Sequence, residues 1–206
     1  MLFVAILLAI IVALTFHEYA HAAVARLLGD RTAEQMGRLT LNPMAHLDPL
    51  GFAMLLIAGF GYAKPVPYNP FALKHQRRDS VLIGLAGPGS NILMATAFAI
   101  VLKIMGPQLG PANLLTQFLY IAAFINVNLA IFNLLPIPPL DGSKMLLAVL
   151  HGGKWAKLRN WIVQQGPFAL LILIIMDHFG GFGIFARLFG FFGELFFAAL
   201  GIPFLS

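Results

Sequence analysis

The chain has 206 residues, of which 60% are hydrophobic and 10% charged, whereas a soluble domain carries about a quarter charged residues. This composition excludes an ordinary soluble enzyme and predicts one integral membrane domain over residues 1–206. The absence of cysteine excludes disulfides and thiolate zinc sites, and the net charge of +5 is expected to reflect basic loops at a membrane rather than a partner nucleic acid.

Apolar runs near the length of a membrane span recur along the chain and predict an all-α polytopic membrane protein. Five such runs cover residues 2–27, 81–105, 114–135, 160–176 and 183–203. A sixth, at 50–63, is shorter than the roughly 17 residues that a spanning helix needs, so we expect it to re-enter the membrane or to lie at its surface. The sequence therefore predicts about five to six membrane segments.

The basic residues favour a re-entrant segment at 50–63. If the chain returns there to the side from which it came, eleven of the 13 Lys and Arg residues share one face, and only Lys103 and Arg187 do not. Basic loops are enriched on the cytoplasmic side of membrane proteins. We therefore predict that this face is cytoplasmic and that the N-terminus lies outside.

Prolines dominate the segment 61–70, which reads GYAKPVPYNP. Pro65, Pro67 and Pro70 exclude a helix interior. Their spacing favours extended backbone, because proline is tolerated in edge strands but not in central ones. We expect a small β-hairpin at the membrane edge.

Two histidines and a glutamate interrupt the first apolar run in the stretch HEYAH. His17 and His21 are four residues apart, so on a helix they project from one face and can bind the same zinc ion, with Glu18 beside it. A carboxylate there can take a proton from metal-activated water. A chance match is a weak alternative, because an unpaired polar group at membrane depth costs on the order of 2–3 kcal/mol or more.

A catalytic zinc needs a third protein ligand, and the sequence offers Asp141 in NLLPIPPLDGSK, residues 133–144. Three prolines there break the helix at the end of a span. Unwound backbone at membrane depth is tolerated where it is buried in protein or lines a polar cavity. The alternative is an aspartate that caps a helix at an interfacial turn. The histidine pair favours a ligand.

These motifs occur together in the order typical of one enzyme family. HEYAH is followed by LNPMAHLDPLG (41–51), GYAKPVPYNP, GLAGPGSNI (84–92) and NLLPIPPLDG. In this arrangement the chain resembles the site-two proteases, which are intramembrane zinc metalloproteases. The resemblance covers most of residues 10–150 and implies a catalytic core at 1–150. The last two apolar runs predict two C-terminal membrane helices within 151–206. No space remains for a peptide-binding or nucleotide-sensing domain.

The resemblance also implies roles for individual residues. His17, His21 and Asp141 match the ligands of one Zn²⁺ per chain, and Glu18 matches the catalytic base. Asn133 matches an asparagine that positions substrate or stabilises the oxyanion; a helix–helix hydrogen bond is the alternative.

Four further positions belong to the same pattern. Gly87 and Asn91 match a small-residue motif that serves either helix packing or substrate contact. For His46 and Asp48 we expect a structural hydrogen-bond pair that holds their loop.

The expected function is intramembrane endopeptidase activity on transmembrane proteins or peptides, in the cell membrane of a prokaryote, with the active site toward the cytoplasmic side. The bilayer is one partner, and the small size of the chain leaves room for an accessory membrane protein. The alternative is a metal transporter or metal sensor that uses the same His and Asp residues. A transport route would need further ligands, and the runs 81–105 and 114–135 contain no Asp, Glu or His.

Overall fold

The computed structural model describes residues 2–58 and 61–204, and these residues are helical apart from their connections. The helices are α1 (Leu2–Leu27), α2 (Thr32–Gln35), α3 (Pro49–Ala58), α4 (Gln76–Leu109), α5 (Leu114–Asn133), α6 (Gly142–Val149), α7 (Ala156–Gly180) and α8 (Ile184–Ala199). Three 3₁₀ turns, η1 (Pro43–Ala45), η2 (Pro70–Ala72) and η3 (Gly153–Trp155), lie between them. The predicted all-α polytopic class is confirmed.

Four helical stretches in the described part of the chain are long and apolar enough to cross a membrane: α1, α4, α5 and the continuous stretch Gly153–Gly180. The prediction of five to six membrane segments is therefore wrong. Helix α8 begins at Ile184, close to the start of the predicted run 183–203, but it ends at Ala199, before Gly201, which has positive φ; it therefore has only 16 residues. With 10 residues, α3 extends about 15 Å, half of a hydrocarbon core.

The predicted β-hairpin is also wrong, since the described residues contain no strand. The segment before α4 is extended, but among its described residues a single β-bridge is formed, between Leu47 and Ala63. Pro65 and Pro67 lack the N–H groups that a ladder needs, so pairing cannot continue along the segment.

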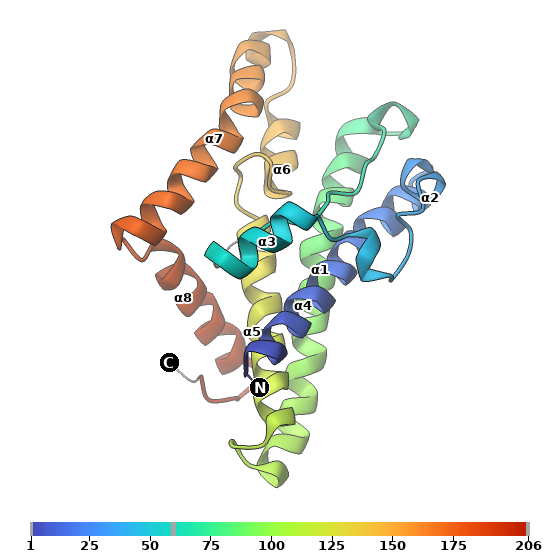
Figure 1. Cartoon of the computed structure of the whole chain (residues 1–206). Helices are drawn as coiled ribbons and strands as arrows, with labels where there is room; N and C mark the ends of the chain where they lie inside the picture. Colours follow the sequence, from blue (N-terminus) through green and yellow to red (C-terminus); the bar gives the residue numbers. More distant parts are fainter. Residues whose placement is uncertain (1, 59–60, 205–206) are drawn as a thin grey trace.

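Small residues hold the centre of the molecule together. Helix α4 packs against both α1 and α5, and α1 also packs against α5 (Figure 1). Alanines fill these contacts: Ala9, Ala13, Ala22, Ala25, Ala95, Ala99, Ala122, Ala123 and Ala130 are all buried. Small side chains let helix backbones approach closely in a membrane, which brings polar groups on separate helices within reach of one another.

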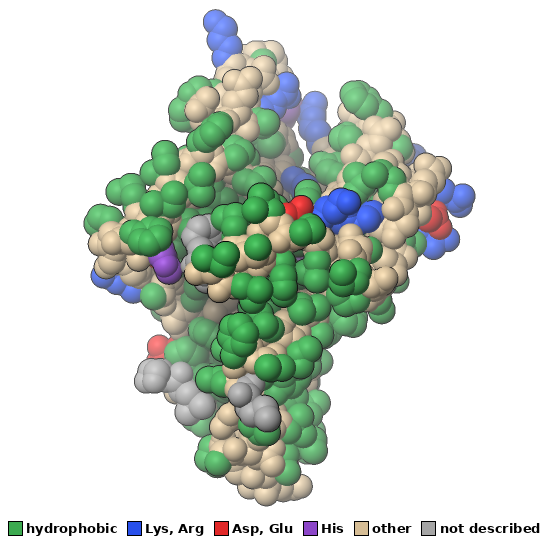
Figure 2. Space-filling view, viewed as in Figure 1, with side chains coloured by type: hydrophobic (Ala, Val, Ile, Leu, Met, Phe, Trp, Pro, Cys, Tyr) green, Lys and Arg blue, Asp and Glu red, His purple; other side chains and the backbone are tan. Residues whose placement is uncertain are grey.

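Helices α7 and α8 form a C-terminal arm: α7 stands apart from the central helices, whereas α8 returns to α5, where Phe197 is fully buried in a cluster with Leu119 and Ala123 (Figure 1). Gly166 of α7 lies against Pro138, where an added Cβ would be 2.7–2.9 Å from ring atoms of the proline. The ring of Phe132 at the end of α5 packs against Phe185 and Phe189 of α8. On the face seen in Figure 2, most Lys and Arg side chains gather at the upper end, away from the N-terminus, and the lower third is largely apolar.

Candidate metal centre

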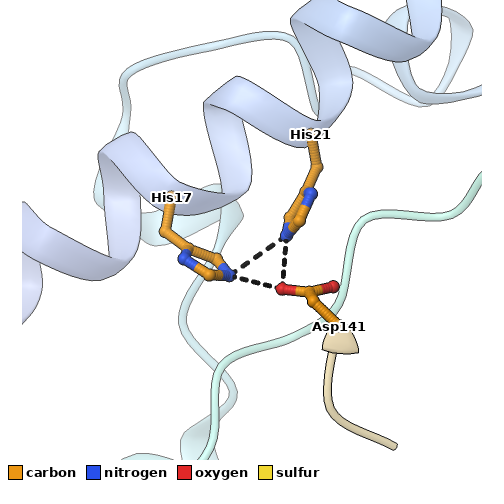
Figure 3. A group of neighbouring side chains, drawn as sticks. All are labelled: His17, His21 and Asp141. Carbon is orange, nitrogen blue, oxygen red and sulfur yellow. Dashed lines mark hydrogen bonds and ion pairs between the residues drawn. The ribbon is translucent and has the colours of Figure 1, made fainter. Parts of the chain in front are cut away.

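Helix α1 presents two imidazoles on one face. His17 and His21 are separated by one helical turn, both are buried, and their Nε2 atoms lie 3.0 Å apart (Figure 3). The two rings meet edge to face with their centroids 4.6 Å apart. Both rings point from α1 toward the chain segment that follows α5.

Asp141 approaches the histidines from the break in the helix after α5. Its Oδ2 lies 3.1 Å from Nε2 of His17 and 3.0 Å from Nε2 of His21. Asp141 occupies the N-cap position of α6, yet its side chain makes no capping hydrogen bond. The structure thus brings together the three residues that the sequence offered as ligands, and it places the carboxylate toward the imidazoles instead of the helix end.

Hydrogen bonds on the far side of each ring fix the histidine tautomers. Nδ1 of His17 lies 2.6 Å from Oδ1 of Asn91, and Nδ1 of His21 lies 2.6 Å from the carbonyl oxygen of Ile83. Both partners are acceptors, so each Nδ1 carries the proton and each Nε2 presents a lone pair to the centre. Such outer partners orient the rings of metal-binding histidines.

The orientation of Asn91 is itself fixed by a buried network. Its Nδ2 donates to the carbonyl oxygen of Ala13 at 3.1 Å and to Oδ1 of Asn126 at 2.9 Å, and Asn126 donates to the carbonyl oxygen of Ala122. Both asparagines are 0% exposed. The network joins α1, α4 and α5 behind His17. From the sequence alone, Asn91 was expected to serve either helix packing or substrate contact. Asn126 was not identified as a functional residue.

The residues fit a zinc ion. Three lone-pair atoms converge at mutual distances of 3.0–3.1 Å, and ligands bonded tetrahedrally at about 2.0–2.1 Å are about 3.3 Å apart. Gly87 of α4 lies beside them. A Cβ at this position would be 2.4 Å from Nε2 of His21 and 2.6 Å from Nε2 of His17, so the glycine leaves the space that an ion would occupy.

Glu18 is buried beside the centre and contacts the extended segment that precedes α4. Its Oε2 accepts a hydrogen bond from the backbone N–H of Val66 at 2.9 Å. The guanidinium of Arg38 holds this segment by donating to the carbonyl oxygens of Lys64, at 2.6 Å, and Pro65, at 3.2 Å. Burial lowers the pKa of Arg38, although the charge of Glu18 opposes the shift. One carboxylate oxygen of Glu18 is thus left without a protein donor among the described residues.

Asn133 is the last residue of α5, and its amide nitrogen donates to the carbonyl oxygen of Leu129 in the same helix. Within the described residues it makes no hydrogen bond to the three ligands.

His46 and Asp48 do not pair with each other. Nε2 of His46 donates to the carbonyl oxygen of Thr40, and Asp48 caps α3 by accepting from the N–H groups of Leu50 and Gly51.

The profile of peptidase family M50 matches this chain over residues 5–111 and 108–175. The chain belongs to peptidase family M50. Membership makes it a zinc metalloprotease by class, and its apolar helices make it an integral membrane protein. The matched region contains His17, Glu18, His21 and Asp141.

Relatives of this M50 peptidase include proteins from bacteria and from an archaeon. A Bacillus subtilis (strain 168) protein named "Putative zinc metalloprotease YwhC" is 38% identical over 188 residues, covering 89% of this chain and 85% of the relative. "Putative zinc metalloprotease Rip2" of Mycolicibacterium smegmatis is 32% identical over 180 residues, which cover 84% of this chain and 67% of the relative. "Putative zinc metalloprotease MJ0611" of Methanocaldococcus jannaschii is 32% identical over 71% of both chains. No solved structure matches the chain.

Proposed function

We propose that this M50 peptidase hydrolyses peptide bonds in transmembrane segments, with one zinc ion held by His17, His21 and Asp141. The convergence of these three side chains, buried in a bundle of apolar helices, carries the proposal. A zinc ion in such a site supplies Lewis-acid chemistry: it polarises a carbonyl group and makes water more acidic. The proposed catalytic unit is residues 1–150, which provide all of these groups, within a single membrane domain of residues 1–206.

Glu18 is the proposed general base. As the water oxygen attacks the peptide carbonyl carbon, a proton passes to Glu18, which later gives it to the leaving nitrogen as the C–N bond breaks. The hydrogen bond from Val66 fixes one oxygen of the carboxylate and leaves the other for this transfer. Asn133 is the proposed oxyanion donor; for this it has to exchange its bond to Leu129 for one to the substrate.

The proposed substrates are membrane-spanning proteins or peptides, cleaved in the cell membrane of a prokaryote at a site toward the cytoplasmic side. The bilayer and an accessory membrane protein are the proposed partners. The depth of the site supports this side, because His21 lies five residues, or roughly 8 Å of helix, before Arg26.

Zinc content of the purified chain tests the metal site before any substrate is known. We expect about one tightly bound zinc per wild-type chain and little in Asp141→Ala. Glu18→Gln is the matched variant: it should retain zinc but fail to cleave a single-span substrate in proteoliposomes. A folded wild type without zinc would refute the proposal, and normal cleavage by Glu18→Gln would exclude that residue as the base. Zinc uptake into sealed vesicles without any cleavage would favour a transporter.

Cysteine labelling tests the proposed orientation independently. The chain has no native cysteine, so Gln35→Cys and Gln76→Cys each report one position. We expect both to react only from the cytoplasmic side of intact cells. Labelling from opposite sides would require the segment between them to cross the membrane.

A further inference from the structure

Lys144 contacts the one oxygen of Asp141 that does not face the histidines. Its Nζ lies 2.6 Å from Oδ1 of Asp141, while Oδ2 lies 3.0–3.1 Å from the Nε2 atoms of His17 and His21. The two oxygens of the carboxylate therefore have separate partners. Lys144 is neither a proposed zinc ligand nor the proposed base, so the proposed function gives it no role.

Neighbouring elements confine the Lys144 side chain, which is 23% exposed. Its Nζ lies 5.7 Å from the centre of the Tyr68 ring, which belongs to the extended segment before α4. Its aliphatic part passes Gly84 of α4, where an added Cβ would lie 2.8 Å from Cδ of the lysine. Contacts on both sides thus direct the ammonium group toward Asp141.

Stability of α6 does not explain the pair. An ion pair between residues three apart on a helix adds little to the stability of the helix. A cation in the first turn, where Lys144 lies, interacts unfavourably with the helix dipole. Asp141 also makes no capping bond to α6. The pair is therefore better explained by the direction it gives to the carboxylate.

We infer that Lys144 is a positioning residue that holds Oδ1 of Asp141 away from the metal, so that Asp141 binds through Oδ2 alone. This inference rests on the proposed function. A carboxylate can bind a metal through one or both oxygens, and a catalytic zinc site keeps one position open beside three protein ligands. If Oδ1 were free, it could take that position. Lys144 thus keeps space for water or a substrate carbonyl oxygen.

Cobalt(II) in place of zinc tests the inference in the purified full-length chain, without a substrate. Four-coordinate cobalt absorbs visible light several-fold more strongly than cobalt with more ligands. We expect strong absorption from wild type and a several-fold loss in Lys144→Met, at unchanged cobalt stoichiometry. Lys144→Arg should keep the wild-type spectrum because it keeps the donor. Lys154→Met is the control: it removes an exposed positive charge that lies 5.4 Å from the centre of the Trp155 ring.

Two outcomes would overturn the inference while leaving the metal site intact: an unchanged cobalt spectrum in Lys144→Met, or an equal loss of absorption in Lys144→Arg. If Lys144→Met does not fold, infrared difference spectra of the wild type with and without metal decide the question. Widely separated carboxylate stretching bands indicate binding through one oxygen, and closely spaced bands would overturn the inference. Wild-type protein that binds no cobalt or zinc would refute the proposed function as well.

Discussion

The central helices and the C-terminal arm use apolar residues in different ways. In α5, 33% of the most apolar stretch is buried, against 11% in the stretch Gly153–Gly180. The central helices α1, α4 and α5 meet through alanine, glycine and asparagine, whereas α7 and α8, apart from the buried Phe197, present large apolar side chains outward. Close backbone approach is therefore found where three polar ligands have to meet. The C-terminal arm has the exposed surface of helices that face lipid.

The largest effect expected in the central helices comes from one added methyl group at Gly87. In Gly87→Ala the new Cβ would lie 2.4–2.6 Å from both Nε2 atoms, so we expect complete loss of zinc binding and of proteolysis. Gly89→Ala is the matched control on the same helix, because nothing lies within 4 Å of its added Cβ. Zinc content of both purified variants checks this. Full zinc in Gly87→Ala would mean that the space beside the histidines is not where the ion binds.

The second effect concerns the asparagine network behind His17. Asn91→Ala removes the acceptor for Nδ1 of His17 and the donor for Oδ1 of Asn126. We expect zinc affinity to fall about 10–100-fold, and the free energy of unfolding to fall by about 1–3 kcal/mol. Zinc titration and thermal unfolding in detergent measure the two effects.

Thr96→Ala is the control for Asn91→Ala, since it also removes a polar group from α4, but one bonded only to the backbone of its own helix. Equal zinc affinity in the two variants would show that Asn91 serves packing alone.

A smaller effect is expected where the C-terminal arm meets the centre. Gly166→Ala places a Cβ 2.7–2.9 Å from Pro138, and overpacking of this kind costs about 1–3 kcal/mol. Because Pro138 lies three residues before Asp141, we also expect a modest loss of zinc affinity, below that of Asn91→Ala. The control is Gly190→Ala in α8, which has open space around its Cβ and gains helix propensity. Similar melting temperatures for both would mean that α7 does not support the turn at Pro138.

The sequence was most informative where local rules decide the outcome. Spacing alone places His17 and His21 on one face of a helix. The prolines before Asp141 predict that the helix ends there, so that Asp141 lies in a non-helical segment. Spanning length predicts α1, α4 and α5, because a bilayer requires long apolar helices.

The remaining features depend on contacts that no local rule contains. The asparagine network joins residues 35 and 74 positions apart, and it exists only because alanines let three helices approach closely. The hairpin prediction was wrong because extended residues were expected to pair, although two of them lack a donor. The predicted number of membrane segments was wrong because α8 ends at Ala199, before Gly201 with its positive φ, and so is shorter than the predicted run 183–203.

The smallest expected effect on the metal centre concerns Asp30, between α1 and α2, whose contribution to stability depends on pH. Burial alone would raise the pKa of this carboxyl, but hydrogen bonds from Thr32 and from the backbone N–H of Asn69 outweigh it and lower the pKa. The lowered value means that the charged form stabilises the folded state. This stabilisation is fully present above the ordinary aspartate pKa of about 4 and is lost as the pH falls below it toward the folded-state value.

Asp30→Asn removes this charge and its dependence on pH. We expect the variant to be less stable than wild type at pH 7, by about 1–3 kcal/mol, and the difference to shrink as the pH falls below about 4. Thermal unfolding in detergent between pH 7 and pH 3 measures it. Because Asn69 ends the extended segment that also contacts Glu18 through Val66, activity at pH 7 should fall slightly while zinc content stays at the wild-type level. A difference in stability that stays constant with pH would mean that the amide loses hydrogen bonds for steric reasons, and that the charge of Asp30 contributes nothing.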